Sequence, residues 1–262
     1  KKLNIMKKIL LLFAFFSITF IGFSQEAEEE GTKDGWTKTG KITFLINQSA
    51  FSNWQAGGDN NFAGNVNLNY DFNYIKGDWL LDNKLLASYG LTINDDDGAR
   101  KTDDRLELNS ILGKKINKHW SASFFLNFKT QFTDGYEYDD GFLGDNEDFP
   151  TSGLFKPAYL SFGPGMLWKK NDNLYVNFAP LTAKFTFITS EVFTLNDSDF
   201  VDENGDTILV YESSDDVETF GVDPGDSSLF EFGLNIRSYY KFDIMKNINV
   251  ENIFTIFSNY ID

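Results

Sequence analysis

The sequence predicts an all-β protein, a transmembrane antiparallel up-and-down β-barrel. Three observations carry this prediction. Apolar and polar residues alternate over long segments, which places one set of side chains on each face of a strand. The segments meet or exceed the ~9–11 residues that a tilted strand needs to cross a bilayer. The connections between them alternate between short and long, as in bacterial outer-membrane barrels.

Composition excludes several classes of protein. The chain of 262 residues contains no cysteine, which excludes disulfides and thiolate metal sites. Its formal net charge of −16 argues against nucleic acid as a partner, because phosphate binding requires a basic surface. The mean hydropathy is mildly polar, which excludes a bundle of transmembrane helices but suits strands that face lipid at alternate residues only.

Residues 1–24 are predicted to be a few upstream residues followed by a secretory signal peptide. Lys7 and Lys8 precede an apolar run over residues 9–23, and Ser24 supplies a small residue at the expected cleavage site. The alternative is an N-terminal membrane anchor. The signal peptide is favoured because the run is shorter than the ~20 residues of a spanning helix.

The predicted domain boundaries follow from the leader. Met6 is the expected initiator, since the chain opens on lysine, and residues 1–5 then lie upstream of it. Residues 25–38 are rich in glutamate at their start and are predicted to form an acidic, flexible segment. Residues 39–262 are predicted to form the barrel.

Nine strands are predicted within the barrel: 39–49, 61–75, 78–93, 103–115, 119–133, 156–169, 173–189, 228–243 and 247–261. The alternation is clearest in residues 62–74, 120–132 and 230–242, where the face assigned to lipid contains no Asp, Glu, Lys or Arg. This suits a bilayer, because an ionised side chain at its midplane costs ~2–4 kcal/mol.

The connections predict the sidedness of the barrel. Short turns are expected near residues 76–77, 117–118, 171–173 and 246–247, and long connections at 52–60, 94–102, 134–155 and 190–227. All long connections then fall on the outer side, and all short turns face the periplasm. Trp79, Trp120 and Trp168 lie beside short turns and are predicted to be membrane-interface aromatics, with ordinary core tryptophans as the alternative.

The predicted strand number is odd, so the ninth strand would end at the outer rim. Barrels of this type usually have an even number of strands. We therefore expect the complete protein to continue beyond Asp262 and to have 10–12 strands. Barrels of about eight strands are filled by side chains and those of 16 or more leave a channel, so this number is compatible with either state.

A series of short motifs resembles a known family. In order they are Asn53–Asn60, Tyr74–Gly77, Trp79 with Asp82-Asn83 and Tyr89-Gly90, Lys129–Phe132 with Gly135-Tyr136, Phe155–Leu160, and Ala179–Thr182. Together they resemble an uncharacterised family of Bacteroidota outer-membrane proteins, known only as a domain of unknown function. The resemblance implies the same barrel and leader, and members that continue past this chain's end. It implies no specific activity.

The interior is predicted to carry charges of both signs. The residues expected to line the lumen are Asp82, Lys84, Glu107, Lys129, Glu231, Arg237, Lys241 and Glu251. A wide pore would keep these groups hydrated, whereas a narrow barrel would pair them and fill itself.

No catalytic residues and no cofactor are predicted. His119 is the only histidine, and it lies at a short turn, away from the outer rim where a barrel hydrolase would place its catalytic groups. No G-x-S-x-G nucleophile motif is present. We therefore expect a protein that is not an enzyme.

The outer loops are acidic: Asp95–Asp97, Asp103-Asp104, Asp139-Asp140, Asp145–Asp148, Asp197–Asp206 and Asp215-Asp216. Loose binding of divalent cations, bridging to lipopolysaccharide, is one hypothesis, although no dedicated metal site is predicted. Residues 202–206 superficially resemble part of an EF-hand loop, but their flanks favour an Asn-Gly hairpin. Trp54, beside Gly57 and Gly58, is either part of a tight turn or a ligand-binding aromatic.

These features favour a passive channel or transporter-like barrel for small solutes in the outer membrane of a Gram-negative bacterium. The alternative is a non-conducting structural or assembly barrel that presents acidic outer loops to partner proteins or lipopolysaccharide. A barrel enzyme is the least favoured reading, because the sequence offers no catalytic cluster for it.

Overall fold

The computed structural model describes residues 34–51, 60–94, 98–136, 149–201, 207–246 and 248–261. The predicted signal peptide and most of the acidic segment lie outside these ranges. Within them the protein consists of strands, turns and loops. A search of these ranges finds no helix that is both long enough and apolar enough to span a membrane.

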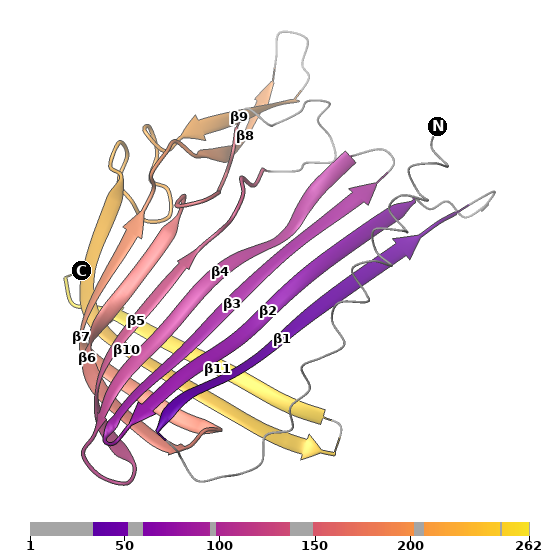
Figure 1. Cartoon of the computed structure of the whole chain (residues 1–262). Helices are drawn as coiled ribbons and strands as arrows, with labels where there is room; N and C mark the ends of the chain where they lie inside the picture. The colour runs from indigo at the N-terminus through magenta and orange to yellow at the C-terminus, as the bar shows by residue number, and fades with distance from the viewer. Residues whose placement is uncertain are drawn as a thin grey trace. The chain divides into compact units, whose positions relative to one another are not determined.

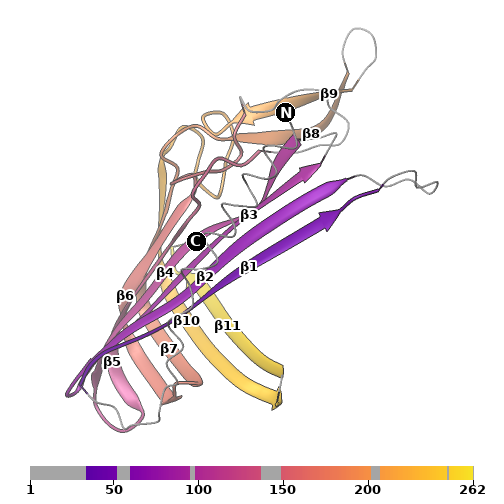
Figure 2. The same cartoon turned by 45° about the vertical axis from the view of Figure 1, so that its right-hand side comes forward.

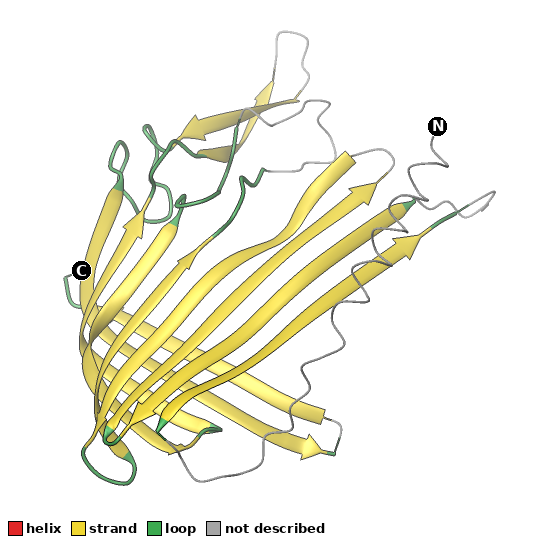
Figure 3. Ribbon diagram, in the orientation of Figure 1, coloured by secondary structure: helices red, strands yellow, loops and turns green. Residues whose placement is uncertain are grey.

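Nine long strands form one antiparallel sheet, and each overlaps a strand predicted from the sequence (Figures 1 and 3). They are β1 (Gly35–Ser49), β2 (Asn61–Lys76), β3 (Trp79–Asn94), β4 (Gly98–Lys115), β5 (Trp120–Thr130), β6 (Ala158–Asn171), β7 (Leu174–Phe187), β10 (Ser228–Met245) and β11 (Ile248–Asn259). Their order in the sheet is their order along the chain. The predicted all-β, up-and-down antiparallel architecture is confirmed, with the largest differences at the starts of β1 and β4, which begin earlier than expected.

Two further strands lie in the long connection between β7 and β10. β8 (Phe193–Val201) and β9 (Thr207–Ser213) pair antiparallel in a separate sheet, with Val201 opposite Thr207. The flanks of the predicted hairpin are therefore paired, and its turn, residues 202–206, lies outside the described residues. Both views place this hairpin beyond the ends of β3 and β4 (Figures 1 and 2).

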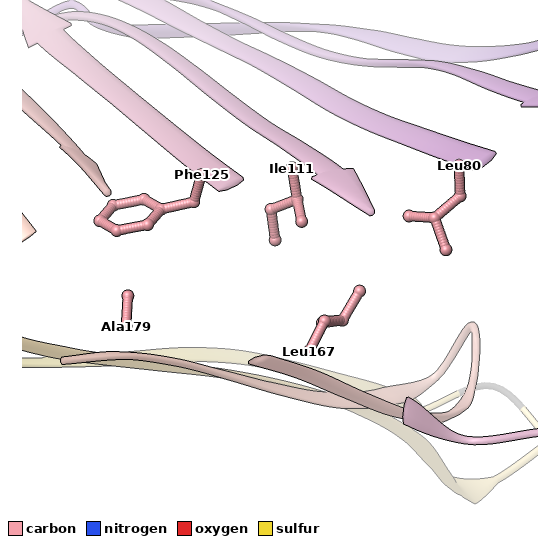
Figure 4. Close-up of a cluster of buried hydrophobic side chains, with 5 residues drawn as sticks. All are labelled: Leu80, Ile111, Phe125, Leu167 and Ala179. Carbon is pink, nitrogen blue, oxygen red and sulfur yellow. The ribbon is translucent and has the colours of Figure 1, made fainter. Parts of the chain in front are cut away.

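The main sheet is strongly curled, so that β3, β4 and β5 form one wall and β6 and β7 the facing wall (Figures 2 and 4). Among the described strands, β1 pairs only with β2 and β11 pairs only with β10. The described strands therefore form a half-barrel with two edges. The tenth to twelfth strands stay a prediction.

The two faces of the curled sheet differ in chemistry. Phe125 points into the gap between the walls, so its neighbour Phe124 points to the convex side, where it is 44% exposed (Figure 4). Large apolar side chains are exposed on most strands, among them Phe44, Val66, Leu112, Phe178, Phe230 and Phe254. In contrast, many of the buried side chains are Asn, Ser and Thr. This distribution is the reverse of that in a water-soluble domain.

A backbone irregularity in β7 is accommodated by a glycine in β6. The pairing of β6 with β7 shifts register around Gly163, where an added Cβ would lie 2.3 Å from the carbonyl oxygen of Leu181. The Thr182 hydroxyl donates to the carbonyl oxygen of Ala179 at 2.9 Å and stabilises this β-bulge. Only glycine fits opposite the bulge, because any Cβ would collide with backbone.

We expect Gly163→Ala to destabilise the sheet by about 1–3 kcal/mol, because the new methyl group forces the β7 backbone away. Gly64→Ala in β2 is the matched control, since an added Cβ there meets no atom within 4 Å. Urea unfolding of the refolded protein, followed by tryptophan fluorescence, measures both. Equal stability of the two variants would show that β7 does not approach β6 this closely.

Candidate functional site: a polar cavity on the concave face

A cavity of about 800 Å³ lies on the concave face and takes lining residues from all nine strands of the main sheet. The lining follows the two-residue period of each strand. In β10, for example, Asn235, Arg237, Tyr239 and Lys241 all face the cavity. The alternation that defined the strands therefore also determines which side chains surround this space.

Most of the residues predicted to line a lumen surround this cavity. They are Asp82, Lys84, Glu107, Lys129, Arg237 and Lys241. Glu231 and Glu251 were also predicted to line the lumen but are not among the lining residues. Each contacts a lysine that lines the cavity: Glu231 accepts a hydrogen bond from Lys184, and Glu251 lies 3.2 Å from Lys84. The sequence missed Lys184 as a site residue, although it lies on the polar side of its strand.

Ion pairs connect strands that are not neighbours in the sheet. The Lys84 ammonium in β3 lies 3.2 Å from Glu251 in β11 and 5.6 Å from the centre of the Tyr239 ring in β10. Lys169 in β6 lies 3.0 Å from Asp82 in β3. Because these strands belong to facing parts of the curled sheet, the pairs cross the interior and narrow it.

Glu107 in β4 is the centre of the most buried polar network of the cavity. Its side chain is only 9% exposed. Arg105 Nε donates to the carboxylate at 3.0 Å, and the amides of Asn109 and Asn127 donate at 2.8 and 3.3 Å. The guanidinium of Arg237, from β10, lies 3.9 Å away. These charge-assisted contacts compensate for the loss of water around a buried carboxylate.

Apolar side chains hold the two walls together beside the polar groups. Leu80, Ile111 and Phe125 project from one wall toward Leu167 and Ala179 on the other (Figure 4). Tyr175 packs against this cluster. The concave face is therefore not uniformly polar. The sequence pattern did not indicate this contact, because it joins residues of five strands.

The three predicted interface tryptophans lie at the short-turn end of their strands. Trp79 and Trp120 begin β3 and β5, and both are about half exposed. Trp168 is paired directly with Trp120 across β5 and β6. The Lys114 ammonium lies 5.4 Å from the centre of the Trp79 ring, which is a cation–π contact.

His119 takes part in the turn between β4 and β5. Its Nδ1 lies 3.2 Å from the carbonyl oxygen of Lys169, and the side chain of Asn117 accepts from the backbone N–H of His119. Over the described ranges, no group of three or more His, Asp or Glu side chains could hold a metal ion.

The acidic loops are described only in part. Asp104 accepts hydrogen bonds from Lys101 and from the backbone N–H groups of Phe132 and Thr133, so it organises the rim of the sheet. Asp215 and Asp216 are exposed. Asp103 accepts a hydrogen bond from the Asn65 amide at 3.1 Å, and Asp197 and Asp199 belong to β8. The remaining predicted positions lie outside the described residues: Trp54, Gly57, Gly58, Asp95–Asp97, Asp139, Asp140, Asp145–Asp148 and Asp202–Asp206.

The long connection that carries β8 and β9 has a core of its own. We call its described residues, 188–201 and 207–227, the outer cap, after the side on which the sequence predicts it. Ile188, Val192 and Val222 are buried together, and Leu229 packs against them. Phe149, from the preceding long connection, stacks on Tyr211 with ring centres 4.9 Å apart. The outer cap is therefore packed through side-chain contacts.

We expect Glu107→Gln to destabilise the protein by about 3 kcal/mol, because it leaves two guanidinium groups without a buried counter-charge. Partial exposure of Arg105 keeps the effect at the lower end of the range for buried pairs. Asp172→Asn is the control, because the Asp172 side chain is 95% exposed and its loss should change stability little. Urea unfolding measures both, and equal effects would contradict the central role of Glu107.

Comparison with known proteins finds a family match over part of the chain. Residues 46–136, from the end of β1 to beyond β5, match the model of a family described as "Protein of unknown function (DUF3078)". No curated protein matches the chain. No solved structure matches it either. The resemblance to a family of unknown function, predicted from the sequence motifs, is thereby confirmed over residues 46–136.

Proposed function

We propose that this protein is an outer-membrane β-barrel with a transporter-like interior, which passes small polar solutes through a narrow, charged lumen. The observation that carries the proposal is the polar cavity of about 800 Å³ on the concave face of a sheet with exposed apolar side chains on its other side. The proposal includes export by a cleaved signal peptide into the outer membrane of a Gram-negative bacterium, one of the Bacteroidota. It includes no catalytic role.

Strand length and surface chemistry support the membrane part of the proposal. The strands of the main sheet contain 11 to 18 residues, whereas a tilted strand needs ~9–11 to cross a bilayer. Their exposed apolar side chains are unfavourable in water and favourable in lipid. In lipid, the backbone groups on the edges of β1 and β11 also need partners, so the proposal requires a closed barrel.

The size of the interior supports a selective passage over a wide pore. Cross-wall ion pairs at Lys84 and Lys169 narrow the space, and the apolar cluster around Phe125 fills part of it. The cavity on the concave face, at about 800 Å³, lies within the ~300–1,000 Å³ of typical small-molecule sites. Charged groups of both signs around it suit polar solutes.

A second candidate function is a non-conducting barrel that presents the outer cap to partner proteins or lipopolysaccharide. The same cross-wall contacts favour it, because paired charges and packed apolar groups can fill a narrow barrel. The stretch 188–227 contains no lysine, arginine or histidine, and its exposed side chains include Asp215 and Asp216. Divalent cations would be needed to join such a surface to anionic lipopolysaccharide.

Single-channel recording distinguishes the two functions. For a transporter-like lumen we expect small, stable conductance steps in a planar bilayer. Asp82→Asn should alter them, because it frees the Lys169 ammonium from its cross-wall partner. Glu26→Gln, in the segment before the sheet, is the charge-matched control. A folded protein that never conducts would reject transport and leave the non-conducting barrel.

A substitution on the convex face tests the membrane itself. We expect Phe124→Arg to destabilise the protein in lipid vesicles by ~2–4 kcal/mol, the cost of an arginine near the bilayer midplane. Ile116→Arg is the control, because Ile116 is 61% exposed beside a short turn, where charge is tolerated. Stability is measured by urea unfolding in vesicles. For a water-exposed face, both substitutions would be nearly neutral, and that result would contradict a membrane location.

A further inference from the structure

Cations outnumber carboxylates around Glu107. Arg105 and Arg237 both contact this one carboxylate, and Lys129 lies directly opposite it in the β4–β5 pairing. Lys129 also lines the cavity, and among the described residues it has no ion-pair partner. One carboxylate thus stands among three cationic side chains, which leaves a local excess of positive charge.

Two other lysines that line the cavity, Lys84 and Lys169, are better compensated. Lys84 lies 3.5 Å from Asp71 as well as 3.2 Å from Glu251. Lys169 contacts Asp82 and Asp172 at 3.0 and 3.1 Å. These lysines each contact two carboxylates, whereas two arginines share Glu107. Lys241 also lines the cavity and has no ion-pair partner among the described residues, so the cavity contains an excess of positive charge that includes the surroundings of Glu107. The protein as a whole carries a net charge of −16.

An amide oxygen without a hydrogen-bond donor lies near this charge. Asn235 lines the cavity and is only 6% exposed, yet its Oδ1 accepts no hydrogen bond. Arg237 is two residues further along β10 on the same face, about 7 Å away at the rise of a strand. A buried acceptor without a donor costs ~1–3 kcal/mol. This oxygen has less than 1 Å² of accessible surface, so a bound O–H or N–H removes that cost only when the Asn235 side chain turns its oxygen toward the cavity.

We propose that the part of the cavity bounded by Lys129, Arg237 and Asn235 binds a small oxyanion that also carries a hydrogen-bond donor. Hydrogen phosphate and small hydroxy- or amino-carboxylates have this chemistry. The Lys129 ammonium and the Arg237 guanidinium bind the anionic oxygens. The Asn235 side chain turns its carbonyl oxygen toward the cavity on binding and accepts from the O–H or N–H. Arg105 holds Glu107 in place, so that this carboxylate does not neutralise Arg237 completely.

This inference deepens the proposed function and rests on it for its physiological meaning, but binding can be measured without conduction. The probe is inorganic phosphate, which carries an O–H at neutral pH, and the comparison is sulfate, which does not. Isothermal titration of the refolded full chain in detergent, at constant ionic strength, measures both affinities. General salt effects act on phosphate and sulfate alike.

Lys129→Gln is the main test, because Lys129 is exposed and unpaired among the described residues, so its loss leaves no buried charge behind. We expect phosphate and sulfate both to bind about tenfold more weakly, the effect of one charge-assisted hydrogen bond. Lys170→Gln makes the same change in net charge on a residue that does not line the cavity, and it should leave both affinities unchanged.

Asn235→Ala tests the donor requirement. The wild-type protein should bind phosphate more tightly than sulfate, and this variant should lose the preference while it keeps affinity for both ions. Absence of phosphate binding to the folded wild-type protein, or equal effects of Lys129→Gln and Lys170→Gln, would overturn the anion site. Equal wild-type affinities for phosphate and sulfate would overturn the role of Asn235. Phosphate binding without conductance would instead reject transport and leave the site intact.

Discussion

Alternation of apolar and polar side chains along consecutively paired strands is the constraint on which this structure depends. Because successive side chains point to opposite faces, each strand contributes one apolar and one largely polar row. Antiparallel pairing in chain order then places all apolar rows on the convex face and the polar rows on the concave face. A shift of one residue in any strand would turn its charges outward, so the chemistry of the two faces fixes the register.

The interior combines two kinds of contact with different consequences. Leu80, Ile111 and Phe125 meet Leu167 and Ala179 across the gap and set the distance between the walls. Polar groups occupy the space beside this cluster, where ion pairs such as that of Lys84 with Glu251 cross between strands far apart in the sheet. Burying a charge is costly unless an opposite charge lies beside it. The charged groups of this cavity therefore need partners, and those partners come from other strands.

The two ends of the sheet are built differently. At one end, tight turns connect the strands, and Asn117 stabilises one of them by accepting from the backbone N–H groups of His119 and Trp120. At the other end, long connections carry the β8–β9 hairpin and the packed outer cap. The outer cap contains no basic residue, whereas the interior near Glu107 has an excess of positive charge.

The sequence by itself determined the nine strands, their order and the face of most side chains, because these follow from a period of two residues and from short turns. It also placed Asp82, Lys84, Glu107, Lys129, Arg237 and Lys241 on one face, and the cavity contains all of them. Only the tertiary structure decided which of these groups meet. The partners are separated by up to 167 residues, as with Lys84 and Glu251, and local patterns carry no information about the curl that joins them. The apolar cluster depends on that curl, because it forms where the two walls meet. The β7 bulge opposite Gly163 and the buried Asn235 oxygen without a donor are likewise visible only once the strands are paired and packed.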